Sequence, residues 1–282
     1  MFTASTTAIQ LQTPTATIQT FSGTFTTQNG TVTSGTIFDI KETFPNSGLI
    51  NYEGTGFNID LALYNAKVAE LDSFGLRLAI YSGNDTLAGG PGNDKLLGFD
   101  GNDLVSGSHG DDELNGNQGN DQVYGGNGND SQHGGQGNDF VSGDKGDDFA
   151  TGSLGNDSVF GGVGDDYVYG GQGDDLVTGG EGNDYLSGDL GDDVLVGNDG
   201  RDLFAFRSNG GRDSIEDLHR AEGDQIGIQI DINGSGIHGF ADLAGHFVPQ
   251  ADGTSINLGA GNFLLVKNRT TSDLAEQDFF FF

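Results

Sequence analysis

The feature that most constrains this chain is an aspartate that recurs every nine residues through its middle. Stepping by nine from Asp85 reaches thirteen more aspartates without an insertion and ends at Asp202. A glycine lies two residues before every one of them, and a second glycine lies five residues before all but the first. A fixed short period is the signature of a repeat architecture, in which each unit buries its apolar face only against its neighbours.

The repeating unit is G-x-x-G-[N/D]-D-x-U-x, in which U is Leu, Val or Phe except at Gln132 and Ala150. Glycines permit tight turns with positive φ, and the alternation in x-U-x predicts a three-residue strand with U on one side. Two units would form a coil with two strands, and stacked coils would form two parallel sheets with U between them. Residues 80–205 are therefore expected to form an all-β parallel roll of about seven 18-residue coils.

Stacking would also align the aspartates in two ladders whose members alternate along the chain. Residues 80–205 carry 25 acidic and three basic side chains. Carboxylates about 4.8 Å apart repel one another by roughly 1 kcal/mol even in water. One aliphatic side chain per unit contributes about 1.5–3 kcal/mol, whereas ordering nine backbones costs about 9–18 kcal/mol. The segment is thus expected to be largely unfolded without a divalent cation, and carboxylate and carbonyl oxygens favour calcium. The candidate metal ligands are Asp85, Asp94, Asp103, Asp112, Asp121, Asp130, Asp139, Asp148, Asp157, Asp166, Asp175, Asp184, Asp193 and Asp202.

These residues closely resemble the RTX family, the hemolysin-type calcium-binding nonapeptide repeats. Near-consensus copies are GGNGNDSQH, GGQGNDFVS and GGQGDDLVT. The resemblance implies a right-handed parallel β-roll with calcium between successive coils, held by the repeat aspartates and by glycine-turn carbonyls. Because seven coils leave six gaps in each ladder, it implies at most about twelve calcium ions.

The resemblance also implies bacterial export by a type I secretion machinery that reads an uncleaved C-terminal signal, and hence an extracellular location. The segment GGRDSIEDLHRAEGDQIGI resembles the one that follows the roll in this family. Asp278 and the four phenylalanines after it resemble the family's acidic and apolar terminus. Residues 206–282 are therefore expected to cap the roll and carry the secretion signal.

The two flanks carry weaker patterns. In residues 1–79, the stretches TATIQTFSGTFTT and GTVTSGTIFDI predict strands, and apolar spacing predicts a helix near 60–72. The role of residues 1–79 is not predicted. In the C-terminal flank, DQIGIQIDI alternates like a strand, FADLAGHF predicts a short helix, and SINLGAGNFLLV predicts two strands joined by a glycine turn.

Composition excludes several classes of function. A net charge of −31 disfavours nucleic acid and anionic membranes as partners. The absence of cysteine excludes disulfides and thiolate metal sites. No apolar run approaches the roughly 20 residues of a membrane span, and the N-terminus lacks the basic and apolar regions of a cleavable signal peptide.

No enzymatic activity is predicted, because the chain contains neither H-E-x-x-H nor G-x-S-x-G. Two alternatives to a stand-alone calcium-binding protein remain open. One is a calcium-dependent adhesin or surface-layer protein with a cell-surface or matrix partner. The other is a hydrolase or toxin with an unrecognised site in the flanks.

Other polar and aromatic residues are given structural roles. The five histidines are predicted to lie at the surface, and Asp213 and Asp217 are predicted to be surface or capping residues. Aromatic side chains at the seventh position of their units are predicted to pack across strands, with a stripe that binds a partner as the alternative. They are Phe140, Phe149, Tyr167 and Tyr185.

Overall fold

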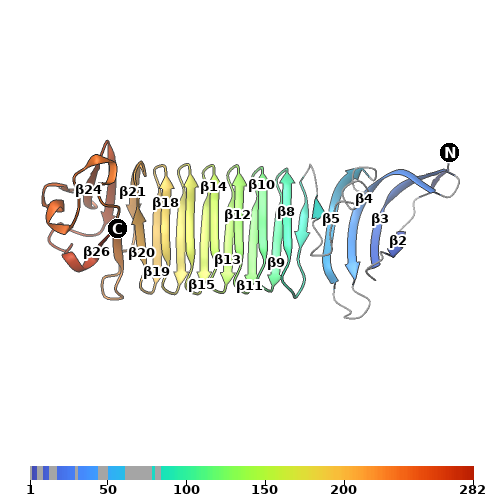
Figure 1. Ribbon diagram of the computed structural model, residues 1–282, viewed down its shortest axis with the longest axis horizontal. Coiled ribbons are helices and arrows are strands. Elements are labelled where there is room, and N and C mark those ends of the chain that lie inside the picture. Colours follow the sequence, from blue (N-terminus) through green and yellow to red (C-terminus); the bar gives the residue numbers. More distant parts are fainter. Residues whose placement is uncertain are drawn as a thin grey trace.

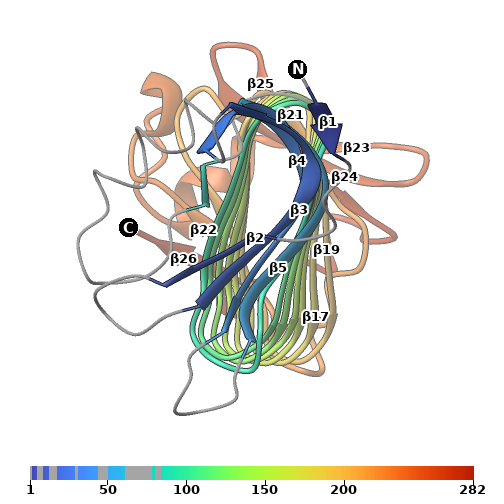
Figure 2. The ribbon, with the colours of Figure 1, turned by 90° about the vertical axis from the view of Figure 1, so that its right-hand side faces the viewer.

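The computed structural model describes residues 84–282 in full. Of the N-terminal part it describes only the backbone of strands at 2–4, 9–12, 18–28, 31–43, 50–60 and 78–79. The described chain is dominated by two long sheets whose strands lie side by side along the molecule (Figure 1). Viewed along that axis, the coils superimpose as a flattened ring with one sheet on each long side (Figure 2).

The roll takes its strands alternately from the two sheets. The first sheet contains β7 (Thr86–Ala88), β9 (Leu104–His109), β11 (Gln122–Asn127), β13 (Phe140–Lys145), β15 (Ser158–Val163), β17 (Leu176–Glu181), β19 (Val194–Asp199) and β21 (Arg212–Ile215). The second sheet contains β6 (Leu78–Ala79), β8 (Lys95–Asp100), β10 (Glu113–Gln118), β12 (Ser131–Gln136), β14 (Phe149–Leu154), β16 (Tyr167–Gln172), β18 (Tyr185–Leu190), β20 (Leu203–Phe206) and β22 (Gln225–Ile228). Neighbouring strands of the repeat are parallel and offset by one coil, so that Val123 lies opposite Val141. The predicted parallel β-roll is confirmed, with about eight turns because the pairing continues beyond both ends of the repeat.

The strands are longer than the sequence predicted. The regular strands have six residues, as in β11, and not three. They continue through the first three positions of the next unit because those positions also bond to the neighbouring coil. The amide of Gly119, for example, donates to the carbonyl of Gln136 at 2.7 Å. Only the fourth to sixth positions of each unit, which end in the repeat aspartate, remain as a tight turn.

The core is a double column of the predicted inward side chains. All are buried: Leu87, Leu96, Val105, Leu114, Val123, Gln132, Val141, Ala150, Val159, Val168, Val177, Leu186, Leu195 and Phe204. The columns continue past the repeat, since Ile215 lies opposite Leu195 and Ile226 lies opposite Phe204. Gln132 breaks the apolar column, because it is fully buried and neither its Nε2 nor its Oε1 has a hydrogen-bond partner.

Replacing Gln132 by leucine is expected to stabilise the roll. Leucine has a similar volume and removes two buried polar atoms, each of which costs about 1–3 kcal/mol when unpaired. The midpoint of thermal unfolding in saturating calcium should rise by roughly 2–4 °C per kcal/mol gained. Differential scanning calorimetry would measure this, with Val141→Leu as a control that enlarges an already apolar position. A midpoint for Gln132→Leu at or below that of the parent chain would contradict the expectation.

The N-terminal strands form an antiparallel extension of the first sheet. The order is β3 (Ile18–Gln28), β4 (Thr31–Thr43) and β5 (Ile50–Asp60), and β5 pairs antiparallel with β7 of the roll. Two short strands, β1 (Phe2–Ala4) and β2 (Ile9–Gln12), pair with β3. The predicted strands of this flank are confirmed. The helix predicted near 60–72 lies outside the described residues, apart from Asp60 at the end of β5.

The C-terminal flank continues both sheets and closes the end of the roll. The predicted hairpin is confirmed as β24 (Gly253–Gly259) and β25 (Asn262–Lys267), with β23 (Phe247–Pro249) beside β24. Strand β25 extends the first sheet from β21, and β26 (Phe279–Phe281) extends the second from β22.

The other elements of this flank are short. The alternation at DQIGIQIDI produces a strand only as far as Ile228. FADLAGHF contains the predicted helix as a single 3-10 segment, η2 (Phe240–Gly245), and two shorter 3-10 turns are η1 (Ile232–Gly234) and η3 (Glu276–Asp278). Within the part of the chain that is described, no helix combines the length and apolarity of a membrane crossing.

Candidate metal centre in the stacked turns

The repeat aspartates lie at the last position of the turns, directly before each strand. Thirteen of the fourteen are buried, with exposed fractions of 1–4%, and Asp94 near the start of the roll is half-buried. They form the two predicted ladders, one along each edge where the chain passes between the sheets. Acidic side chains are rarely buried unless they are paired or bind a cation.

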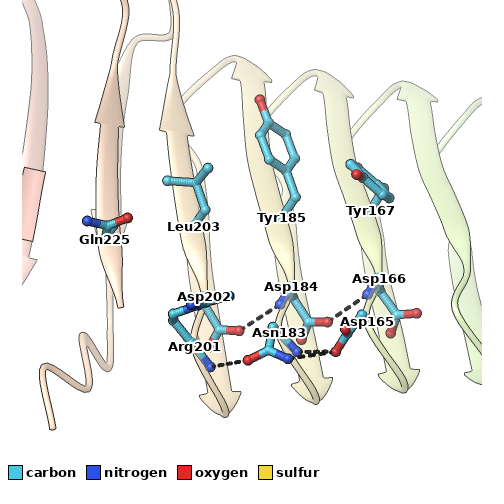
Figure 3. A pocket seen from close by; sticks show the side chains of 10 residues that line it. All are labelled: Asp165, Asp166, Tyr167, Asn183, Asp184, Tyr185, Arg201, Asp202, Leu203 and Gln225. Atoms are coloured by element: carbon cyan, nitrogen blue, oxygen red, sulfur yellow. Dashed lines mark hydrogen bonds between the residues drawn. The ribbon is translucent and has the colours of Figure 1, made fainter. Parts of the chain in front are cut away.

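From Asp103 onward, one oxygen of each repeat carboxylate joins successive rungs of its ladder. The backbone amide of Asp139 donates to Oδ1 of Asp157 at 2.8 Å, and equivalent bonds of 2.7–3.0 Å recur along both ladders. Figure 3 shows three successive rungs, with Asp202 accepting from Asp184 and Asp184 accepting from Asp166. These bonds fix the side-chain rotamer and orient the other oxygen.

The second oxygen has no partner. Oδ2 is buried and accepts no hydrogen bond in any repeat aspartate except Asp94, whose Oδ2 accepts from the amide of Gly90. A buried carboxylate oxygen without a donor is strongly destabilising unless a positive charge lies beside it.

The turn glycines make room beside these oxygens. A β-carbon on Gly170 would overlap Oδ2 of Asp175 and would lie 2.8 Å from the carbonyl oxygen of Gly188 in the next coil. The same crowding recurs at Gly98, where a β-carbon would overlap Oδ2 of Asp103 and the carbonyl of Gly116. Only glycine leaves carboxylate and carbonyl oxygens from two coils around one space, and hard oxygen ligands of this kind suit calcium.

The electrostatics of the ladders disfavour charged carboxylates. Burial raises the pKa of the Asp175 carboxyl to about 8, against the lowering effect of the amide of Asp157 and with the added repulsion of Asp193. Burial likewise raises the pKa of Asp166 to about 8 and that of Asp157 to about 6. Without a cation, the ladders therefore hold ionised carboxylates only at a cost.

A further series of stacked side chains, the outer ladder, runs beside each aspartate ladder and was not predicted from the sequence. The residue before each repeat aspartate is Asn or Asp in every unit but the last. Its Oδ1 accepts from the backbone amide one coil later. The amide of Asn120 thus donates to Asn102 Oδ1 at 2.9 Å. Figure 3 shows the end of this ladder at Asp165, Asn183 and Arg201. The [N/D] at the fifth position of the unit was the available signal.

The outward aromatic rings pack across strands, as predicted. Ring centroids are 5.2 Å apart between Phe140 and Phe160, and 5.8 Å apart between Tyr167 and Tyr185. The two tyrosines also border a shallow groove of about 450 Å³ that reaches Arg201 and Gln225 (Figure 3). The rings therefore brace neighbouring coils on the outside, as the inner columns do on the inside.

The remaining polar predictions have mixed outcomes. None of the five histidines is buried, and Asp217 is a capping residue that accepts from the amides of Gly197 and Asn198. Asp213 was predicted to be a surface or capping residue. The surface alternative is wrong, because Asp213 is only 6% exposed, whereas its Oδ1 does accept from the amide of Asp193 at 3.1 Å. Two extra residues before Asp213 displace it from the nine-residue register and hid this equivalence.

In the described part of the chain, no group of three or more His, Cys, Asp or Glu side chains is placed to hold a metal ion. Each gap instead offers aspartate oxygens together with backbone carbonyls, so any bound ion would depend largely on the main chain. The assignment of the fourteen aspartates as calcium ligands stays a prediction.

Comparison with known proteins supports the interpretation of the repeat. The family model for the RTX calcium-binding nonapeptide repeat (4 copies) matches residues 81–113, 97–132, 106–141, 133–168, 142–177 and 169–204. No curated protein matches the chain. Among solved structures, the chain is similar to the crystal structure of extracellular lipase LipA from Serratia marcescens, with 15% identity and a TM-score of 0.30. That match covers 67% of this chain and 38% of the lipase. Residues 81–204 therefore contain several copies of the RTX calcium-binding nonapeptide repeat.

Proposed function

We propose that this chain is a secreted calcium-binding protein whose roll folds when calcium enters the gaps between stacked turns. One observation carries the proposal. Along both ladders, a buried aspartate Oδ2 faces a glycine turn and has no hydrogen-bond donor. Calcium in each gap would replace repulsion between rungs by attraction to two coils at once.

Secretion fits the same chemistry. A roll that is unfolded at low cytosolic calcium could be exported as an extended chain and fold in the higher calcium outside the cell. Mass action would then drive folding by RT ln(1 + [L]/Kd) for each occupied site. The resemblance of residues 206–282 to the segment that follows the roll in RTX proteins supports a type I secretion signal there.

The proposal gives the roll a binding role and assigns it no catalytic step. A calcium-dependent adhesin is the second candidate, because the outer rings of Phe149 and Tyr167 remain 38% and 55% exposed. Calcium-dependent attachment of the purified protein to cells or matrix would favour that candidate.

A matched pair of substitutions in one turn tests the calcium role. Asp175→Asn removes a buried negative charge from the proposed site but keeps the Oδ1 acceptor for the amide of Asp157. Asp174→Asn makes the same charge change one residue earlier, at an exposed position where Asn183 stands one unit later. Isothermal titration calorimetry should show at least one calcium ion fewer for Asp175→Asn and the parent stoichiometry for Asp174→Asn.

Two outcomes would contradict the proposal. One is a parent chain that binds no calcium after dialysis against EGTA. The other is an equal stoichiometry for all three proteins.

A further inference from the structure

The turn at 208–213 lies beyond the last repeat but has the conformation of a repeat turn. Its sequence, SNGGRD, lacks the first glycine of the unit, and Asp213 follows Asp193 by 20 residues where the repeat has 18. Even so, φ is positive at Asn209 (68°) and Gly211 (99°). The equivalent positions one coil earlier, Asp189 and Gly191, have φ of 67° and 145°.

The backbone hydrogen bonds of the repeat are also reproduced. The amide of Gly191 donates to the carbonyl of Gly210 at 2.9 Å, as the amide of Gly173 does to Leu190 at 2.8 Å. The amide of Ser214 donates to the carbonyl of Asp193 at 2.8 Å, which is the bond that starts each repeat strand. The turn at 208–213 thus stacks on the turn at 188–193 in the regular way.

The aspartate ladder on this edge and the outer ladder beside it both extend into the turn at 208–213. The amide of Asp193 donates to Oδ1 of Asp213 at 3.1 Å, which adds one rung to the aspartate ladder. The amide of Arg212 donates to Oδ1 of Asp192 at 2.9 Å, which adds one step to the outer ladder. The side chain of Arg212 points elsewhere, with its guanidinium 5.3 Å from the centroid of the Phe263 ring.

The space between these two turns is lined by oxygen atoms that lack a counter-charge. Asp193 and Asp213 are 1% and 6% exposed. Oδ2 of Asp193 is buried without a hydrogen-bond partner, and the bond that Asp213 accepts from the amide of Asp193 is at Oδ1. A β-carbon on Gly210 would lie 3.2 Å from Asp213 Oδ2 and 3.4 Å from the carbonyl oxygen of Asp189. No lysine or arginine of the described chain forms an ion pair with either carboxylate.

We propose that the gap between the turns at 188–193 and 208–213 holds a further calcium ion outside the matched repeat, with Asp193 and Asp213 as its carboxylate ligands. Backbone carbonyls of the two turns would complete the oxygen shell. The inference rests on the proposed function, because it requires the regular gaps to bind calcium as well. With this ion bound, the turn at 208–213, at the start of the C-terminal flank, becomes one more calcium-binding turn of the roll.

The other aspartate ladder, which contains Asp202, ends in a different arrangement and serves as a comparison. Asp224 adds a rung there, since its Oδ1 accepts from the amide of Asp202 at 3.0 Å. Its Oδ2, however, accepts from the amide of His219 at 2.5 Å, and Glu222 accepts from the amide of Gly200. Hydrogen bonds therefore satisfy both oxygens of Asp224, so Asp224 is expected to contribute no ligand to a metal ion, although Oδ2 of Asp202 has no partner.

Native mass spectrometry of the full chain in saturating calcium tests the inference by counting ions. Asp213→Asn keeps the Oδ1 acceptor and should bind one calcium ion fewer than the parent chain. Gly210→Val, which fills the space without removing a carboxylate, should lose the same ion. Asp224→Asn should keep the parent count, and far-UV circular dichroism should show the same β-structure for all three variants in calcium.

If Asp213→Asn and Gly210→Val both bound as many calcium ions as the parent chain, the inference would be overturned and the proposed function would stand. A loss of one ion in Asp224→Asn would also overturn it, because the two ends would then be alike. A parent chain that binds no calcium would instead refute the proposed function. The two failures are therefore distinguishable.

Discussion

Removal of calcium with excess EGTA is expected to convert residues 84–215 from β-structure to an unfolded chain. The buried Oδ2 atoms along both ladders have no partner in the protein, and the inner columns supply only one side chain per unit. A single site at a calcium concentration of 100 Kd contributes about 2.7 kcal/mol. Three such sites would contribute about 8 kcal/mol, which is comparable with the whole stability of an ordinary domain.

Far-UV circular dichroism would measure the loss, and hydrogen exchange would locate it. Amides that bond to the ladder, such as those of Asp139 and Asp166, should exchange rapidly in EGTA and slowly in millimolar calcium. Magnesium at equal concentration should fail to restore the spectrum, because it requires a tighter octahedron than the glycine turns supply. Sodium chloride at matched ionic strength controls for charge screening.

A roll that keeps its β spectrum and its protected amides after exhaustive chelation would contradict this expectation. The unpartnered carboxylate oxygens would then be tolerated without metal. Calcium would not be the agent that folds the chain.

The repeat region of this fold could be predicted because every nine-residue unit carries the same few residues that determine its turn and its inward side chain. Glycines at fixed positions allow the turn, and one apolar residue per unit faces inward, so the period alone predicts coils, sheets and the aspartate ladders. Even Gln132, which is polar, occupies the predicted inward position. The strand length was not predictable from the x-U-x alternation, because the extra strand residues are paired through backbone hydrogen bonds to the neighbouring coil.

The ends of the roll were harder to predict because their geometry is tertiary. Two inserted residues remove Asp213 from the register, and only its stacking on Asp193 restores the equivalence. Asp224 looks similar in sequence, but the amide of His219 satisfies its second oxygen. Contacts between segments decide whether the second oxygen of a carboxylate at the end of a ladder accepts a hydrogen bond. The nine-residue period of the sequence does not predict those contacts.

Acidification is expected to act in opposite directions with and without calcium. In the folded chain, burial raises the pKa of Asp157 to about 6, that of Asp121 to about 7 and that of Asp166 to about 8, whereas the ordinary aspartate value is 3.8. Between about pH 4 and pH 8 the metal-free folded chain therefore binds more protons than the unfolded chain, so its stability falls as pH rises. In EGTA, β-structure should increase as the pH is lowered from 8 to 5. In calcium, the same change should weaken binding, since protons compete for the carboxylates.

Asp175→Asn isolates this charge effect at one rung. In EGTA at pH 8 the variant should be more ordered than the parent chain, because it removes a buried charge. Each unit by which burial raises the pKa of this carboxyl corresponds to about 1.4 kcal/mol. Asp174→Asn should change the pH profile less, because the exposed Asp174 carboxylate is only the smallest of the causes that raise the pKa of Asp175. Circular dichroism from pH 4 to 8 with and without calcium would measure all three proteins. If acid reduced β-structure in EGTA, or if Asp175→Asn were no more ordered than the parent, repulsion between buried carboxylates would not be what keeps the metal-free roll unfolded.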